Sequence, residues 1–275
     1  MKNEKKIGIF AYPYVIWMVI FVIVPLLIMG YYGFTTKEGT FTFENISSIA
    51  DPIHLKALWT SVYLSIICTV ICFLLALPLA MVIRSMHIKS SGFMIFVFIL
   101  PMWMNFLLRT IAWQSLLEKS GVINSVLTFV GLPEQNMINT EGAIVLGMVY
   151  NYLPFMVLPI YNALAKISQD TFDAAKDLGA GKWQIMRRIT LPLIFPGIVS
   201  GSTMVLVPAL TTFVLSDLLG GAKVHLIGNV IEQEFTTANN WNMGAGLSLV
   251  LMVLVVGSMA LMSKYDKNGE GAGLW

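Results

Sequence analysis

The chain has 275 residues, of which 57% are hydrophobic and only 12% are charged. Soluble domains usually carry about 25% charged residues, so this composition excludes an ordinary soluble protein and indicates one that lies in a bilayer. The formal net charge of +2 is too small to indicate a nucleic-acid partner.

Six apolar stretches are long enough to cross a bilayer, whose hydrocarbon core requires about 20 mostly apolar residues per helix. They are expected at Ile9–Tyr32, Ser61–Ile83, Gly92–Trp113, Gly142–Leu164, Leu193–Leu215 and Gly244–Met262. Prolines interrupt several of them, which membrane helices tolerate where neighbours or water satisfy the freed carbonyl groups. The sequence therefore predicts an all-α membrane protein with about six transmembrane helices, forming a single transmembrane domain over residues 1–275.

The distribution of lysine and arginine predicts how these spans are oriented, because positive charge accumulates on the cytoplasmic side. With the N-terminus inside, 12 of the 17 basic residues fall in inner segments and 5 fall in outer segments. Both termini are therefore predicted to be cytoplasmic. The outer segments are net negative, which favours a cationic substrate, although acidic outer loops are common.

Three outer segments, residues 35–60, 114–141 and 216–243, are longer than a tight turn requires. The second contains the apolar stretch Val122–Val130, which is too short to span and is followed by Gly131-Leu132-Pro133. We expect an interfacial or half-inserted helix there. The last two segments either line an external entrance or pack at the interface.

The inner segment after the fourth span, residues 166–192, is rich in charged and small residues. Asp170 is the expected N-cap of a short helix, and Asp173 lies where a negative charge favours the positive helix start. Ala174-Ala175 gives this helix a small face, and Gly179 is placed to end it in a left-handed conformation. The pattern predicts a short helix that protrudes on the inner side and lets another protein approach its backbone closely.

A second helical turn is expected at Lys182–Ile189, with Pro192 at the start of the fifth span. The alternative is a basic amphipathic loop that lies on anionic lipid headgroups. The acids Asp170, Asp173 and Asp177 disfavour that alternative for the first helix.

The inner segment also carries a long gapped pattern: Asp173-Ala174-Ala175, three residues, Gly179, nine residues, Ile189, one residue, Leu191-Pro192. It resembles the EAA loop of binding-protein-dependent ABC importer permeases, and Asp173 in place of Glu is the one departure. In that family the loop forms the coupling helix that docks into a cleft on a cytoplasmic ATPase. The resemblance implies the fold of a type I ABC importer permease.

The same resemblance implies which residues couple the chain to the ATPase. The docking core would be Asp173, Ala174, Ala175 and Gly179, and the rest of the motif is Ile189, Leu191 and Pro192.

Further stretches are similar to the spermidine/putrescine permeases. They are Ala11-Tyr-Pro-Tyr with Val24-Pro25, Leu100-Pro101-Met-Trp103 with Arg109-Thr-Ile-Ala-Trp113, Val207-Pro208-Ala-Leu, Ser216-Asp217-Leu-Leu-Gly-Gly221 and Ile227-Gly228-Asn229. The resemblance implies a permease subunit of a polyamine importer in the bacterial cytoplasmic (inner) membrane. Its implied partners are a second permease subunit, a cytoplasmic ATPase dimer and an extracytoplasmic polyamine-binding protein.

Motifs for chemistry within the chain itself are missing from the sequence. Gly181-Lys182 is followed by Trp183 where a phosphate-binding loop requires Ser or Thr, and Lys176 occupies the place of its first glycine. ATP is therefore expected to be used by a separate ATPase chain. We expect no catalytic residue, metal site or cofactor in this chain, which is predicted not to be an enzyme.

A polyamine is a flexible polycation, so its path should combine carboxylates with aromatic faces, which attract ammonium groups. The proposed substrate-path residues are Asp217, Trp103, Trp113 and Tyr152. The alternative for Trp103 and Trp113 is an aromatic belt at the membrane surface.

Two other functions remain open. One is a permease of the same fold for another small solute, such as an anion or a sugar, with which Arg109, Asn105 and Asn151 are compatible. The other is an ion-coupled secondary transporter, which should carry acids in the middle of its spans. No acid lies in the middle third of any of the six, which disfavours the secondary transporter.

Overall fold

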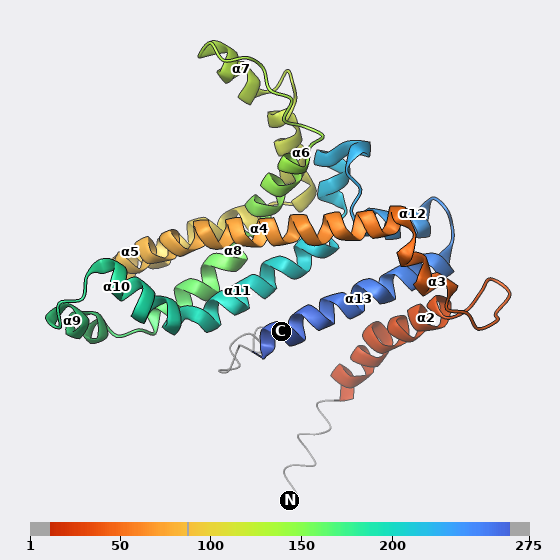
Figure 1. The fold of residues 1–275 in the computed structure, drawn as a ribbon, viewed down its shortest axis with the longest axis horizontal. Helices are drawn as coiled ribbons and strands as arrows, with labels where there is room; N and C mark the ends of the chain where they lie inside the picture. Colours follow the sequence, from red (N-terminus) through yellow and green to blue (C-terminus); the bar gives the residue numbers. More distant parts are fainter. Residues whose placement is uncertain (1–11, 87, 265–275) are drawn as a thin grey trace, which may run out of the picture. The chain divides into compact units, whose positions relative to one another are not determined.

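The computed structural model describes residues 12–86 and 88–264. In these ranges the chain is helical, and apart from an isolated antiparallel bridge between Thr35 and Phe41 it contains no strand. The predicted all-α class is confirmed. The elements (Figure 1) are η1 Val19–Ile23, α2 Val24–Gly33, α3 Glu44–Ser47, η2 Ser48–Ala50, α4 Pro52–Ser85, α5 Ile88–Ile99, η3 Leu100–Trp103, α6 Phe106–Leu117, α7 Val122–Phe129, α8 Glu141–Ala165, α9 Gln169–Asp177, α10 Lys182–Ile185, η4 Met186–Thr190, α11 Leu191–Thr211, η5 Ser216–Gly220, η6 Gly221–Lys223, α12 Ile227–Thr236 and α13 Trp241–Ser263.

Within the described ranges, five helical stretches are long and apolar enough to cross a membrane. They are Tyr12–Gly33, Pro52–Ser85, Glu141–Ala165, Lys182–Thr211 and Trp241–Ser263. A sixth span exists if Gly92–Trp103 and Phe106–Phe129, which meet at a bend of 88°, count as one. The number of spans is thus as predicted. The start of the first predicted span at Ile9, and both chain termini, lie outside the described residues.

The third predicted span, Gly92–Trp113, is not one straight helix. Helix α5 ends at Ile99, a short 3-10 turn follows, and α6 begins at Phe106. Pro101 has no backbone N–H to donate, and the side chain of Asn105 accepts bonds from the backbone N–H groups of Leu107 (2.8 Å) and Leu108 (3.4 Å). Asn105 therefore caps a new helix, and the chain turns there.

The fifth span also differs from its prediction of Leu193–Leu215, because the helix runs from Lys182 to Thr211. A wider π-helical turn, Met186–Thr190, precedes Pro192, so the helix passes the proline without a break. At the other end Thr212 is extended, and Asp217 lies on the separate short turn η5 rather than at the end of the span.

The short apolar stretch after α6 folds into α7, which confirms the helix predicted at Val122–Val130; its place at the outer membrane surface stays a prediction. Buried Asn124 fixes the connection that follows. Its amide group donates to the carbonyl oxygens of Glu118 (3.2 Å) and Gln135 (3.0 Å), and its side-chain oxygen accepts from the N–H of Gln135 (2.9 Å).

The described residues pack as two compact units, one of residues 12–56 and 230–254 and the other of 57–229 and 255–264. In the smaller unit, α2 and α13 are tied by Asn242, whose amide group donates to the carbonyl oxygens of Tyr32 (3.1 Å) and Thr35 (2.6 Å). Such side-chain bonds hold membrane helices together where no hydrophobic force does.

The core of the larger unit lies where α8 packs along α11. Two glycines one turn apart on α11 permit this close approach. A Cβ atom added to Gly197 would lie 2.7 Å from the carbonyl oxygen of Pro159, and one added to Gly201 would lie 2.8 Å from the sulfur of Met156. This spacing of small residues is the usual device of closely packed membrane helices. The pair α8–α11 therefore forms a rigid frame for the loop that joins it.

Candidate functional site

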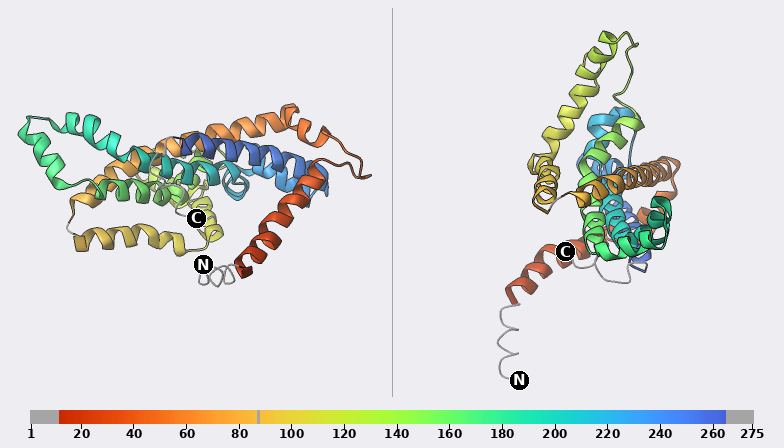
Figure 2. Two further views of the ribbon diagram at one scale, coloured as in Figure 1. Left: turned by 90° about the horizontal axis from the view of Figure 1, so that it is seen from below. Right: turned by 90° about the vertical axis from the view of Figure 1, so that its left-hand side faces the viewer.

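The loop between α8 and α11 contains a short exposed helix, α9. Figures 1 and 2 show it beyond the adjoining ends of α8 and α11. It ends at Gly179, whose φ of +78° is the left-handed conformation expected from the sequence. The N–H of Gly179 bonds to the carbonyl of Lys176 (2.8 Å) and that of Ala180 to the carbonyl of Ala175 (3.0 Å), which is a Schellman motif.

The start of α9 corrects the sequence prediction. Ser168, not Asp170, is the residue before the helix, and its backbone is extended. Its hydroxyl group lies 2.9 Å from that of Thr171. Asp170 lies in the first turn instead, where its charge still favours the positive end of the helix.

The predicted docking residues divide between two faces of α9. Asp173, Ala174 and Gly179 are exposed, whereas Ala175 is buried against the unit. Leu178 is 89% exposed, although it is a large apolar side chain at the end of a charged helix. The free face of α9 therefore combines a carboxylate, a small residue and an uncovered apolar side chain.

Asp173 is held in place by its neighbours on α9. Lys176 donates to its carboxylate at 2.8 Å and Gln169 at 3.2 Å. These hydrogen bonds, with that of Lys176 the stronger influence, lower the pKa of Asp173 below its usual range. The carboxylate therefore stays ionised at neutral pH.

The last three motif residues lie apart from this face. Ile189 is in the π-helical turn, and Leu191 and Pro192 begin α11. Ile189 and Leu191 are half-buried, and Leu191 packs against the core of the larger unit. These residues connect the loop to α11 and do not form part of its exposed tip.

A side chain of α4 fastens α9, and no sequence pattern singles it out. The guanidinium group of Arg84 donates to the carbonyl of Ile167 (2.6 Å) and lies 4.4 Å from the ring centre of Phe172. A cavity of about 400 Å³ beside it is lined by residues including Lys176 and Lys182. In the sequence, Arg84 is one of many basic residues predicted to lie on the inner side. Its two contacts are with residues 83 and 88 positions further along the chain, so they become visible only in the folded structure.

The four proposed substrate-path residues lie in different surroundings. Within the described residues, no hydrogen bond or ring contact joins one to another. Trp103 is 75% exposed and packs edge-on against Phe96. Tyr152 is buried in the core, where its hydroxyl group lies 3.4 Å from the carbonyl of Pro208.

Asp217 helps to close the loop between α11 and α12. The amide group of Asn229 donates to its carboxylate and to the carbonyl of Phe213 (3.1 Å), while the hydroxyl of Ser216 donates to the carbonyl of Val224 (2.6 Å). The side-chain oxygen of Asn229 accepts from the N–H of Leu226 (2.9 Å). Asp217 thus has a structural role that the sequence did not indicate.

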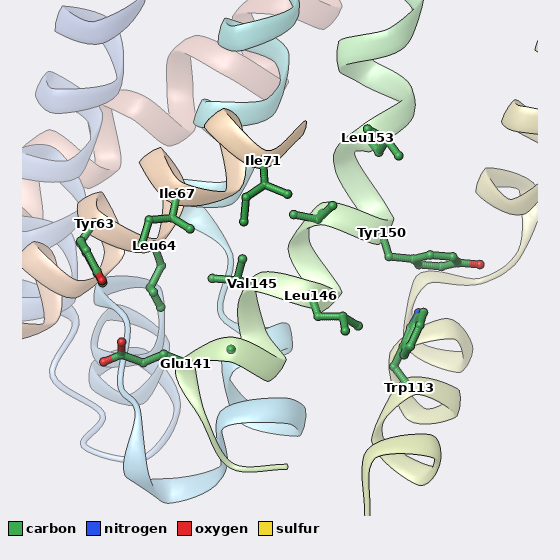
Figure 3. Close-up of a pocket in the computed structure, with 12 residues that line it drawn as sticks. Tyr63, Leu64, Ile67, Ile71, Trp113, Glu141, Val145, Leu146, Tyr150 and Leu153 are labelled. Carbon is green, nitrogen blue, oxygen red and sulfur yellow. The ribbon is translucent and has the colours of Figure 1, made fainter. Parts of the chain in front are cut away.

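Trp113 lines a groove of about 700 Å³ between α4, α6 and α8 (Figure 3). Its ring packs edge-on against Tyr150, with the centroids 5.3 Å apart. Figure 3 shows this ring pair on one side of α8 and Glu141 with Tyr63 on the other, with aliphatic side chains between them. The groove brings one predicted residue together with three that the sequence did not single out.

Comparisons with known proteins agree with this architecture. The family described as "Binding-protein-dependent transport system inner membrane component" matches residues 90–266. The spermidine/putrescine transport system permease protein PotB of Haemophilus influenzae is 38% identical over 247 residues, covering 87% of this chain and 86% of that protein. PotB of Escherichia coli is 35% identical over 254 residues, covering 90% and 92%.

The fold has a solved counterpart in a bacterial alginate ABC transporter, crystallised with an alginate pentasaccharide-bound periplasmic protein. Its matching chain has a TM-score of 0.83 at 18% identity, with coverage of 97% of this chain and 95% of that chain. The structural likeness shows the fold, and the sequence matches show the family. The chain is therefore a type I ABC importer permease that belongs to the binding-protein-dependent inner membrane components, in the family of the PotB permeases.

Proposed function

We propose that this chain is the transmembrane permease subunit of an ATP-driven importer for polyamines, spermidine and putrescine. The observation that carries the proposal is the identity of 35–38% with PotB permeases over most of the chain. Its partners would be a second permease subunit, a cytoplasmic ATPase dimer that uses the ATP, and an extracytoplasmic polyamine-binding protein. The chain itself would catalyse no reaction and hold no cofactor.

The chain would lie in the bacterial cytoplasmic membrane with both termini on the cytoplasmic side, as the distribution of basic residues indicates. Residues 1–275 would form a single transmembrane domain. Continuous helices support this: α4 and α13 each contribute residues to both compact units without a break.

Helix α9 would dock on the ATPase through its exposed face. The exposure of Asp173, Ala174 and Gly179 supports this part of the motif resemblance, and exposed Leu178 would add an apolar contact. Buried Ala175 would instead let α9 lie close against its own chain. Ile189, Leu191 and Pro192 would carry displacement of the loop into α11.

Arg84 would act as the link between α9 and α4. Its bond to Ile167 and its contact with the Phe172 ring tie the loop to the end of a long membrane helix. When nucleotide closes the ATPase dimer and displaces α9, α4 would move with it, together with the close-packed pair α8–α11. The permease pair would thereby change from inward-open to outward-open.

Trp103, Trp113, Tyr152 and Asp217 remain the proposed substrate-path residues. Trp113 has the best structural support, because it lines a groove together with a second ring and a carboxylate. Asp217 would act indirectly, by holding the outer loop that receives the binding protein.

Uptake in cells tests the proposed function. Cells that lack other polyamine importers and express the intact operon should accumulate labelled spermidine or putrescine, and cells with this gene deleted should not. Labelled sugars and organic anions serve as controls for the alternative substrates. Accumulation of one of those, with no polyamine uptake, would show that the importer class is right and the substrate is wrong.

A further inference from the structure

We propose that the groove between α4, α6 and α8 binds an extended linear triamine, with one amine at Glu141 and another at the Trp113–Tyr150 ring pair. The inference rests on the proposed function and deepens it, because it assigns the substrate a site and a preferred length. The groove holds about 700 Å³ and is formed by residues of one compact unit.

The first end of the groove is a carboxylate. Glu141 is the first residue of α8, is exposed, and lines the groove together with Tyr63 of α4. In the described part of the chain, no lysine or arginine pairs with its carboxylate. An acid in the first turn of a helix is favoured by the helix dipole, so Glu141 by itself does not indicate a binding site. It becomes a candidate to bind an amine only together with the aromatic residues at the opposite end of the groove.

That opposite end is aromatic. The rings of Trp113 and Tyr150 meet edge-on at 69°, and Tyr150 remains 38% exposed. A cation within about 6 Å of such a ring is attracted to its face. In the described ranges, neither ring has a lysine or arginine over its face; a cation lies over a different ring, that of Phe172, where the cation is Arg84.

Aliphatic side chains lie between the two ends. They come from α4 and α8 and are Leu64, Ile67, Ile71, Val145, Leu146 and Val149. A sugar or a hydrated inorganic ion would lose hydrogen bonds on such a surface. The methylene segments of a polyamine gain by leaving water on such a surface. The central amine of a triamine finds no polar side chain there, so it would have to keep its water at the open side of the groove while the two terminal amines engage the two ends.

The separation of the two ends selects for length. Glu141 and Tyr150 belong to one helix and are nine positions apart, which at about 1.5 Å and about 100° per residue places them about 13 Å apart along its axis and on opposite edges of the face that lines the groove (Figure 3). A ligand that joins the two ends must therefore cross this face diagonally, and an extended triamine such as spermidine would do so with each terminal amine in contact with a side chain that reaches toward it. A four-carbon diamine such as putrescine reaches about half as far, so it would engage one end at a time.

Transport kinetics of the complete importer test the inference. The complex is reconstituted in liposomes with the same polyamine-binding protein throughout, and kcat/KM is measured for spermidine and for putrescine. Glu141→Gln and Tyr150→Leu should lower kcat/KM for spermidine about tenfold, the usual effect of losing one charge-assisted contact, and for putrescine less than twofold. Glu141→Asp and Tyr150→Phe, which keep the charge and the ring, should retain most of the preference for spermidine.

Matched controls are Glu134→Gln, an exposed carboxylate before α8, and Tyr31→Leu, an exposed tyrosine outside the groove. Both should leave the ratio of the two kcat/KM values unchanged. Stimulation of ATP hydrolysis by the loaded binding protein reports whether each variant assembles; if Glu141→Gln does not assemble, Tyr150→Leu and its Phe counterpart decide.

Two results would overturn the inference while the proposed function stands. One is an equal loss of kcat/KM for spermidine and putrescine in Glu141→Gln and Tyr150→Leu. The other is an unchanged ratio of the two kcat/KM values in these variants, as expected if lipid or a helix of the second permease fills the groove. If the wild-type complex imports neither polyamine, the proposed function is overturned, and this inference falls with it.

Discussion

Gly179 ends α9 with a backbone conformation that other residues rarely adopt. Its φ is +78°, and a Cβ added there would meet no atom within 4 Å, so backbone strain and not a clash opposes substitution. A left-handed conformation costs most residues about 1–2 kcal/mol and a β-branched residue more, whereas asparagine tolerates it. Gly179→Val should therefore lower polyamine import about tenfold, and Gly179→Asn should lower it only slightly.

Import rates of the two variants at equal membrane levels check this prediction. Equal activity of the valine and asparagine variants would mean that the left-handed end of α9 is unimportant for coupling.

The contribution of the Asp173 carboxylate to ATPase binding is predicted not to change with pH near neutrality. Hydrogen bonds from Lys176 and Gln169 lower its pKa, so its stabilising effect on α9 is complete above the usual aspartate pKa. That effect is lost only as the pH falls further, through the lowered pKa. Binding of the ATPase to Asp173→Asn complexes should be weaker than wild type by a constant factor between about pH 6 and 8. Pull-down of the ATPase at several pH values measures it, and a factor that varies with pH in this range would contradict the assignment.

Close packing of α8 and α11 depends on two glycines of α11. A Cβ at Gly197 would lie 2.7 Å from both the Pro159 carbonyl and the Ala163 side chain, and backbone cannot yield as a flexible side chain does. Gly197→Leu should destabilise the subunit by about 1–3 kcal/mol or more, the usual cost of overpacking. Gly257→Ala on α13 is the matched control, because a Cβ there meets nothing within 4 Å.

Thermal unfolding of the purified subunit in detergent compares the two variants. The control should match or exceed wild type, because alanine favours a helix over glycine. A Gly197→Leu protein as stable as the control would show that α8 and α11 do not form the rigid frame described above.

The link between α4 and α9 is predicted to determine how much substrate moves per ATP. Arg84→Gln removes the charge from the Phe172 ring and weakens the bond to Ile167. ATP hydrolysis should continue in this variant while import falls severalfold, because α9 still docks but no longer moves α4. Phe172→Tyr should keep the coupling and Phe172→Leu should lose it. A proportional fall of both rates would instead indicate a role in folding alone.

Across the whole molecule, local signals were readable in the sequence and long-range contacts were not. Hydropathy located the spans, and the glycine after a small-faced helix predicted the left-handed end at Gly179. The third span breaks at Pro101 and is capped anew by Asn105. Both residues stand in the sequence, but an average of hydropathy over a window does not detect a helix cap. The prediction of Asp170 as the N-cap was wrong, because serine and aspartate are both favoured there and short-range preference does not separate Asp170 from Ser168.

The candidate site shows the same division. The coupling motif lies within one stretch of the chain, residues 173–192, so its spacing alone located α9. The groove joins residues from α4, α6 and α8, and the Arg84 link joins α4 to α9 and to the loop before it. No local pattern relates Glu141 to Trp113 or Arg84 to Phe172. Such pairs become apparent only when the helices are packed.

We propose that this chain couples ATP hydrolysis by its partner to polyamine import through α9. The most direct measurement is the number of spermidine molecules imported per ATP hydrolysed in liposomes that contain the complete complex, for wild type and Gly179→Val. Wild type should show a fixed ratio and the variant a much lower one, at similar membrane levels. Import by wild type without ATP hydrolysis, or an unchanged ratio in the variant, would contradict it.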